Sequence, residues 1–148
     1  MSKDKKAKAR FNPANKKQPK LSESPSFHGL HPSWRVGRIQ TQHPFGCHEL
    51  TADEWNRLRN HLSSLERQTW EEILIRAKKQ NHNVAIDDLS RPAQDRLRQI
   101  FDPLDFDDLL SLRLSGRERI WGILDRGAVT LLWWDPNHEV CPSELKHT

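Results

Sequence analysis

The sequence has few of the features that mark secreted or membrane proteins. Two cysteines, Cys47 and Cys141, are too few for a disulfide framework. No apolar run approaches the roughly 18–20 residues that cross a bilayer. The basic N-terminus is not followed by the apolar stretch that a secretory signal needs. These absences predict a cytoplasmic protein with no membrane partner.

Several catalytic motifs are missing as well. The chain has no Walker A sequence, no GxGxxG after a strand, no HExxH and no GxSxG. Nucleotide-binding, zincin and serine-hydrolase functions therefore have no support in the sequence. We expect no cofactor.

Apolar residues are scarce, and the deficit is concentrated at the N-terminus. Hydrophobic residues make up 34% of the chain, against roughly 45–50% in average domains counted with glycine. Residues 1–25 hold eight Lys or Arg and two Asp or Glu, so they carry +6 of a chain whose total is +4, which leaves −2 for the remainder. A segment of this composition cannot bury enough apolar surface to fold. We predict a disordered basic tail over 1–25 and a single domain over 26–148.

The tail has two interpretations. Clustered lysines such as Lys16 and Lys17 can contact nucleic acid without sequence specificity. The tail can also serve only to keep the protein soluble. Charge alone supports association but does not define a function.

Local signals predict one strand and three helices before residue 109. Thr51 with Glu54, and Thr69 with Glu72, have the spacing of capping boxes. Ser90 can cap a further helix. Apolar residues recur at helical spacing behind each of these starts. The predicted strand spans residues 34–40, and the predicted helices span 52–65, 70–79 and 90–101.

The apolar period then changes from 3.6 residues to two. Leu110, Leu112 and Leu114 alternate with polar residues, which is typical of a half-buried strand. Glycine-containing turns separate two further strands, at 118–125 and 128–135. Strands after a helical block predict an α+β domain. We expect the helices to pack on one face of an antiparallel sheet that ends in a three-stranded meander, with Ile120, Leu124, Leu131 and Trp133 pointing inward.

The stretch LRLSGRERIWGILDRGAVTLLWW resembles the end of the RelE/ParE-type toxins of bacterial toxin–antitoxin systems. In that family an arginine commonly opens the middle strand of the meander and is followed by apolar and aromatic residues, as in Arg119-Ile120-Trp121. The resemblance covers residues 109–138 in sequence, and 34–138 in the order of elements. The predicted helix at 90–101 and the basic tail depart from the compact family pattern.

This resemblance implies a RelE-like fold and a ribosome-dependent mRNA endoribonuclease that needs no metal. Its partners would be an antitoxin protein, mRNA and the ribosome. Such cleavage needs a proton acceptor, a cation for the charged phosphorane and an acid for the leaving oxygen. The implied catalytic residues are Arg119, His138 and Arg117. The implied RNA-binding residues are Arg113, Trp121 and Trp134. Lys16 and Lys17 of the basic tail are predicted to bind RNA on the ground of their charge and not of the resemblance.

Each of these residues also has an interpretation without chemistry. Arginines on a strand are commonly a solvated sheet face, and tryptophans most often belong to the core. His138 follows a strong turn signal, Asp135-Pro136-Asn137. The alternative function is therefore a non-catalytic interaction protein, associated with nucleic acid through its basic tail.

Sulfur and imidazole groups occur near both ends of the domain. Zinc favours four such ligands, but neither group has C-x2-C spacing, so a zinc site and idle side chains both remain open. The candidate ligands are His43, Cys47, His48, His138, Cys141 and His147.

Overall fold

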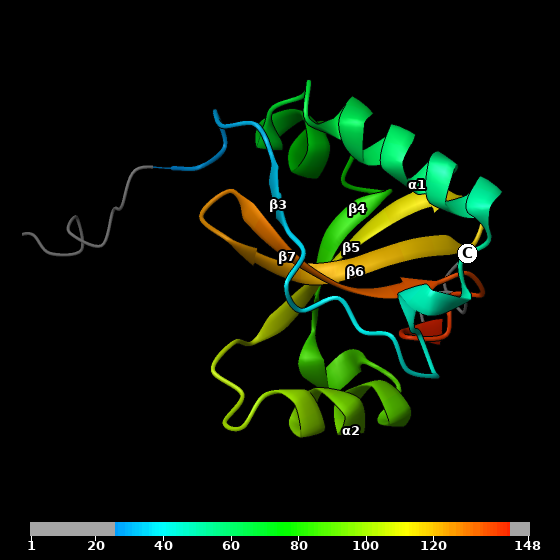
Figure 1. Cartoon of the computed structure of the whole chain (residues 1–148). Coiled ribbons are helices and arrows are strands. Elements are labelled where there is room, and N and C mark those ends of the chain that lie inside the picture. The colour runs from blue at the N-terminus through cyan, green and yellow to red at the C-terminus, as the bar shows by residue number, and fades with distance from the viewer. Residues whose placement is uncertain (1–25, 143–148) are drawn as a thin grey trace, which may run out of the picture.

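The computed structural model describes residues 26–142, which form a five-stranded sheet with helical segments on both faces (Figure 1). The strand order is β3-β7-β6-β5-β4, with β3 parallel to β7 and every other pair antiparallel. The α+β prediction is confirmed, but the sheet is mixed and not wholly antiparallel. The strands are β3 (Ser33–Arg35), β4 (Asn81–Ala85), β5 (Asp108–Ser115), β6 (Glu118–Asp125) and β7 (Ala128–Asp135).

The predicted meander is confirmed, and it consists of strands β5, β6 and β7. Arg126 and Gly127 join β6 to β7 with positive φ angles of 52° and 95°. Two central residues with positive φ match the twist of the strands that they connect. The turn between β5 and β6 contains Gly116, also at positive φ.

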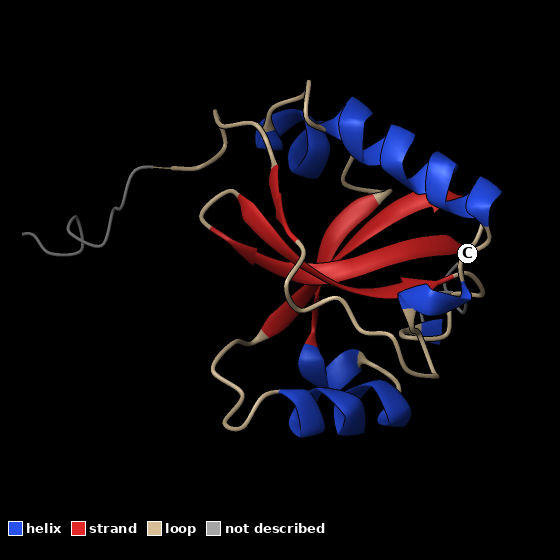
Figure 2. Cartoon of the chain, in the orientation of Figure 1, coloured by secondary structure: helices blue, strands red, loops and turns tan. Residues whose placement is uncertain are grey.

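Two helices begin at their predicted caps (Figure 2). Helix α1 (Ala52–Leu65) has the full capping box of Thr51 and Glu54. Helix α2 (Arg91–Ile100) begins after Ser90, whose hydroxyl accepts from the amide of Ala93. Short 3₁₀ turns, η2 (Cys47–Glu49) and η4 (Ile86–Asp88), complete the connections.

The predicted helix at 70–79 is shorter and differently wound. It is a π-helical turn, η3 (Glu72–Arg76). The buried Asn81 amide at the start of β4 donates to the carbonyl of Ile73 at 3.3 Å, so the chain turns into the sheet where a longer helix would have continued. The five-residue edge strand β4 follows, which is a second strand before residue 109 where only one was predicted.

The predicted strand at 34–40 is also shorter, because β3 ends at Arg35. The chain leaves β7 there and bonds to it again at Gln40, whose amide donates to the carbonyl of Leu132 at 2.9 Å. The register of β6 and β7 shifts between Trp121 and Gly122. Leu132 and Trp133 consequently belong to one core cluster, and Trp134 belongs to the other.

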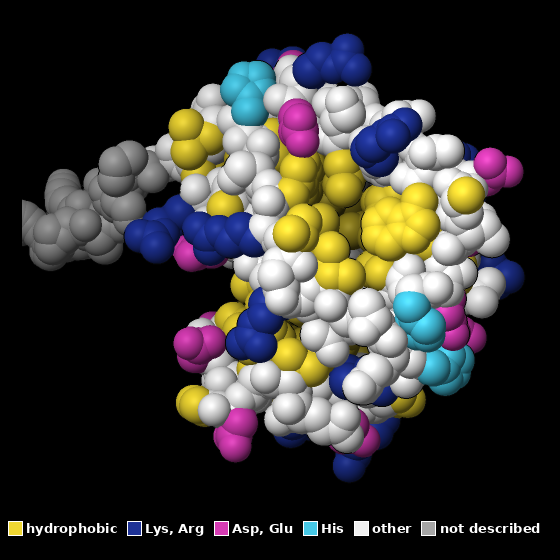
Figure 3. All heavy atoms as spheres, viewed as in Figure 1, with side chains coloured by type: hydrophobic (Ala, Val, Ile, Leu, Met, Phe, Trp, Pro, Cys, Tyr) yellow, Lys and Arg dark blue, Asp and Glu magenta, His cyan; other side chains and the backbone are white. Residues whose placement is uncertain are grey.

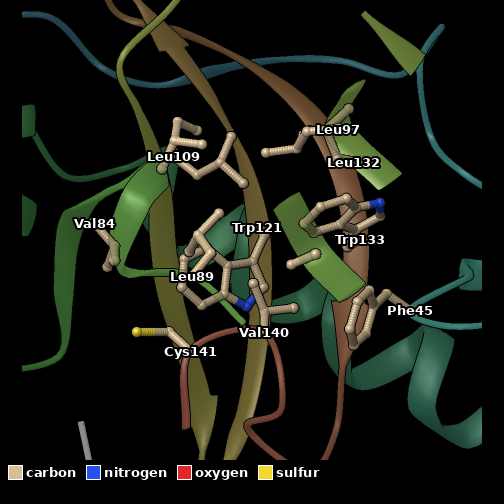
Figure 4. Packing of buried hydrophobic residues seen from close by; sticks show 12 residues of the cluster. Phe45, Val84, Leu89, Leu97, Leu109, Trp121, Leu132, Trp133, Val140 and Cys141 are labelled. Atoms are coloured by element: carbon tan, nitrogen blue, oxygen red, sulfur yellow. The ribbon is translucent and has the colours of Figure 1, made fainter. Parts of the chain in front are cut away.

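The prediction that all helices pack on one face is wrong. Helix α1 and η3 lie on one face of the sheet and α2 lies on the other (Figure 1). The reason is that the meander strands are apolar on both sides. Leu110 and Leu112 pack on the α1 side, whereas Leu109 packs on the α2 side, in the cluster shown in Figure 4. Of the predicted inward residues, Ile120 and Leu131 are buried on the α1 side with Leu124 partly buried against them, and Trp133 is buried on the α2 side.

Candidate functional site

A row of polar residues crosses the α2 face of the sheet near the turn that joins β5 to β6. Arg113 of β5 is the direct partner of Arg119 in β6, and Arg119 is the direct partner of Asp135 in β7. Directly paired residues on antiparallel strands share a face, with Cβ atoms about 4.5–5.5 Å apart. The strand order therefore brings together two of the predicted site residues, Arg113 and Arg119, and places Asp135, which was not predicted as a site residue, beside Arg119.

The two arginines form a like-charge pair across the strands. Arg113 is exposed and Arg119 is half-buried. The Nη1 atom of Arg119 donates to the carbonyls of Gly116 at 2.8 Å and Glu118 at 3.1 Å. Like charges at direct cross-strand positions are unfavourable, and the register of β5 and β6 places these two cationic side chains at such positions.

Asp135 fixes the turn beside this row. Its side chain is fully buried and accepts from the indole Nε1 of Trp121 at 3.1 Å, the amide of Glu139 at 2.8 Å and the amide of Val140 at 3.0 Å. These bonds hold the chain that follows β7 against the sheet. His138 lies in this turn with a positive φ of 60° and is only 2% exposed.

His82 also lies on this face, although it was not among the predicted site residues. It lies in β4, is half-buried, and is the direct partner of Ser111. Ser111 and Arg113 are two residues apart on one strand, so His82 and Arg113 share the α2 face. Ser111 is fully buried, and its hydroxyl has no hydrogen-bond partner among the residues that the structure describes. The only sequence signal for His82 was an isolated histidine in a short strand, which has no motif to distinguish it.

The other predicted site residues are not part of this row. Arg117 is exposed in the turn between β5 and β6. Trp121 and Trp134 are buried, in the clusters on opposite faces of the sheet, so neither presents a ring face for a base to stack on. Lys16 and Lys17, with the rest of the predicted tail over 1–25, lie outside the described residues.

A bidentate ion pair ties α1 to the start of β6. Arg57 donates from Nη1 and Nη2 to the two carboxylate oxygens of Glu118 at 2.7 and 3.0 Å. The hydrogen bonds from Arg57 hold the pKa of the Glu118 carboxyl below its ordinary value, and a bond from the Ser115 hydroxyl acts in the same direction. This pair fixes the strand end that carries Arg119.

His61 of α1 lies on the other face of the sheet from the polar row. Burial lowers the pKa of its imidazole, and a hydrogen bond with the backbone of Arg113 partly opposes this shift. The His61 imidazole therefore bonds to the β5 backbone from the face opposite the arginine pair.

The two cysteines lie in different clusters. Cys47 packs on the α1 side and Cys141 on the α2 side, both as free thiols. Burial raises the pKa of the Cys47 thiol to about 11. Within residues 26–142, no three His, Cys, Asp or Glu side chains are grouped so that they could hold a metal ion. His147, named above among the zinc ligands, is outside that range.

A second feature is an apolar groove of about 410 Å³ between α1 and the residues that follow β3. Figure 3 shows hydrophobic side chains gathered in this hollow, with charged groups near its rim. It lies on the opposite side of the sheet from the polar row, because its floor includes Ile120 and Leu131.

The chain was compared with protein-family models, with curated proteins and with solved structures, and none matches it. Among the described helices, none combines the length and the apolar character that crossing a bilayer requires.

Proposed function

We propose that this protein is a RelE-like toxin, a ribosome-dependent mRNA endoribonuclease whose RNA backbone site is the polar row on the α2 face. The observation that carries the proposal is the direct cross-strand pairing of Arg113 with Arg119. Two arginines at paired positions suit a phosphate, since each guanidinium group presents several donors in a fixed plane. The resemblance of residues 109–138 to the toxin family supports the same assignment.

In metal-independent cleavage of RNA, the 2′-oxygen bonds to the adjacent phosphorus while the bond from phosphorus to the 5′-oxygen breaks. One proton leaves the 2′-hydroxyl and another is delivered to the departing 5′-oxygen. Arg113 and Arg119 would stabilise the negative charge that grows on the phosphorane oxygens. Proton transfer needs an imidazole within reach of the same phosphate. His82 meets this need, because it lies on the same face as Arg113 at a diagonal position, roughly 7–8 Å away between backbones.

The roles of the remaining residues change within this proposal. His138 is almost fully covered, so we assign it to shaping the turn after β7 and not to touching the RNA. Trp121 and Trp134 stabilise the core that supports the strands. Arg117, exposed at the tip of the turn, would contact a neighbouring phosphate.

Induced expression in a bacterial host tests the proposal. Wild type should arrest growth, and Arg119→Ala and Arg113→Ala should relieve the arrest while keeping a native circular dichroism spectrum. Arg98→Ala, at an exposed position on α2, is the matched control and should arrest growth like wild type. Full arrest by both site variants would contradict the assigned site, and no arrest by wild type would count against the toxin proposal.

The second candidate is a non-catalytic interaction protein, and the apolar groove favours it. Small-molecule sites are typically concave, largely apolar and about 300–1,000 Å³ in volume, and this groove meets all three conditions. The basic tail would add non-specific contact with nucleic acid. Wild-type protein that leaves growth unaffected but binds a ligand in the groove would support this candidate over the toxin.

A further inference from the structure

The groove beside α1 has a sharply divided lining. Its floor is formed by apolar side chains from the helix and the sheet, including Leu58, Leu62, Ile120 and Leu131. Apart from the Cys47 thiol and the indole N–H groups of two tryptophans, every polar group of the lining belongs to α1 or to the residue that follows it. These four are exposed and therefore form the rim: Asn56, Arg59, Ser63 and Glu66.

Two tryptophans belong to the same lining. Trp55 on α1 is 41% exposed, although it is the kind of residue that a small domain normally covers. Trp34 of β3 is half-buried, and its indole Nε1 donates to the carboxylate of Glu66 at 2.8 Å. Val36, which also lines the groove, is 65% exposed. The groove thus leaves large apolar side chains in water when it is empty.

The two charged groups of the rim are not equivalent. Glu66 is already engaged by Trp34. Arg59 donates only to the neighbouring Asn60 side chain, at 3.4 Å, and within residues 26–142 it forms no ion pair. The cation of the rim is therefore the group that lacks a countercharge, which selects an anionic head group.

The floor also restricts the body of the ligand. A peptide backbone placed there would lose its hydrogen bonds to water, and the leucine and isoleucine side chains of the floor offer none in return, which costs free energy for each amide. The lining also includes Trp133, whose buried indole N–H has no hydrogen-bond partner among the described residues but could serve only one carbonyl group. A hydrocarbon chain has no hydrogen bonds to lose in the same place. At about 30 Å³ for a group the size of a water molecule, 410 Å³ holds roughly a dozen methylene-sized groups.

From these features we infer that the groove binds an alkyl carboxylate of about eight to twelve carbons, with its chain along the floor and its carboxylate at Arg59. The chain would cover Trp55 and Val36, and the head group would supply the missing countercharge. This site is separate from the polar row, and its test does not depend on nuclease activity.

The experiment is a titration of the full-length protein with decanoate, followed by tryptophan fluorescence and by calorimetry. Saturable binding of one decanoate per chain is expected. Octanoate should bind about fifteenfold more weakly, because each buried methylene contributes about fourfold in affinity. Decyltrimethylammonium, which has the same chain and the opposite charge, should bind more weakly than decanoate.

Two variants test the placement. Trp55→Ala should weaken decanoate binding at least fivefold, and Arg59→Gln should weaken it about two- to fivefold, as expected for a charge pair in contact with solvent. Ile75→Ala and Arg76→Gln, at exposed positions in η3 outside the groove lining, are the matched controls and should bind like wild type.

Three results would overturn the inference. The first is no saturable binding of decanoate to folded protein. The second is equal affinity in wild type, Trp55→Ala and Arg59→Gln. The third is self-association of wild type in light scattering that Trp55→Ala abolishes, since a second copy of the chain would then occupy the groove.

Discussion

Arg113 on β5 and Arg119 on β6 stand directly opposite each other on the α2 face of the sheet. The backbone around them is held firmly. The amide of Arg113 donates to the carbonyl of Gln80 and to the side chain of Asn81, both at 3.2 Å. Two cationic side chains are thus attached at directly paired positions of neighbouring strands, and this arrangement is the basis of the proposed RNA site.

The ion pair between Arg57 and Glu118 predicts a dependence of stability on pH. The pKa of Glu118 is lower in the folded protein than its ordinary value of 4.5. A lowered carboxyl pKa contributes stability above the unfolded pKa, and the contribution is lost as the pH falls through the folded pKa. Glu118→Gln should therefore be less stable than wild type at pH 7. The difference should shrink steadily below about pH 4.5, as measured by urea unfolding across pH.

The same pair is partly exposed, so salt should weaken it. Raising the ionic strength at pH 7 should reduce the stability difference between wild type and Glu118→Gln. A difference that stays constant from pH 7 to pH 3 would show that Glu118 acts through packing and not through its charge.

Substitution of the buried Asp135 side chain should strongly lower the stability of the protein. Asp135→Asn replaces one carboxylate oxygen with a donor, although three donors converge on the side chain. Lost bonds to a charged acceptor should lower the free energy of unfolding by about 2–3 kcal/mol. Asp125→Asn, at an exposed position paired only with its neighbour Arg126, should stay within about 0.5 kcal/mol of wild type. Equal effects of the two substitutions in chemical denaturation would refute the role of Asp135.

The position of Gly122, where β6 meets the irregular part of β7, has no room for a side chain. A Cβ atom at this position would lie 2.5 Å from the carbonyl oxygen of Thr130 and 2.7 Å from a methyl group of Val129. Since the first of these is backbone, the strands would have to separate. Gly122→Ala should lower the free energy of unfolding by about 1–3 kcal/mol.

Gly37→Ala is the matched control for this substitution, because no described residue other than its chain neighbours has an atom within 4 Å of the added Cβ. Thermal unfolding of both variants beside wild type measures the difference. A stable Gly122→Ala protein with unchanged β-sheet signal would mean that β6 and β7 are less tightly paired than the structure describes.

Local signals in the sequence were sufficient for the elements that depend on local physics. The caps at Thr51 and Ser90 and the alternation along β5 fixed α1, α2 and the meander, because capping and side-chain alternation need only neighbouring residues. The turn at Arg126 and Gly127, where both residues have positive φ, is also determined by local sequence.

Features that depend on distant contacts could not be predicted in this way. Leu132 is an extra residue in the pairing of β6 with β7, and it places Leu132 and Trp133 on the same face of the sheet. The period of the apolar residues in the sequence does not reveal this irregularity. The strands are apolar on both sides because helical segments cover both faces of the sheet. The alternation of apolar and polar residues along β5 predicts only one buried face. His82 joins the arginine row only through the pairing of β4 with β5. The groove likewise forms only where α1 meets the residues after β3.

The most direct test of the central claim is cleavage of mRNA bound to ribosomes by purified protein, mapped by primer extension. Wild type should cut the message within the ribosome-bound region. The double variant Arg113→Gln with Arg119→Gln should cut it about a hundredfold more slowly, as expected when groups that stabilise the transition-state charge are removed. Uncut message with wild type, or equal cutting by the double variant, would contradict the account.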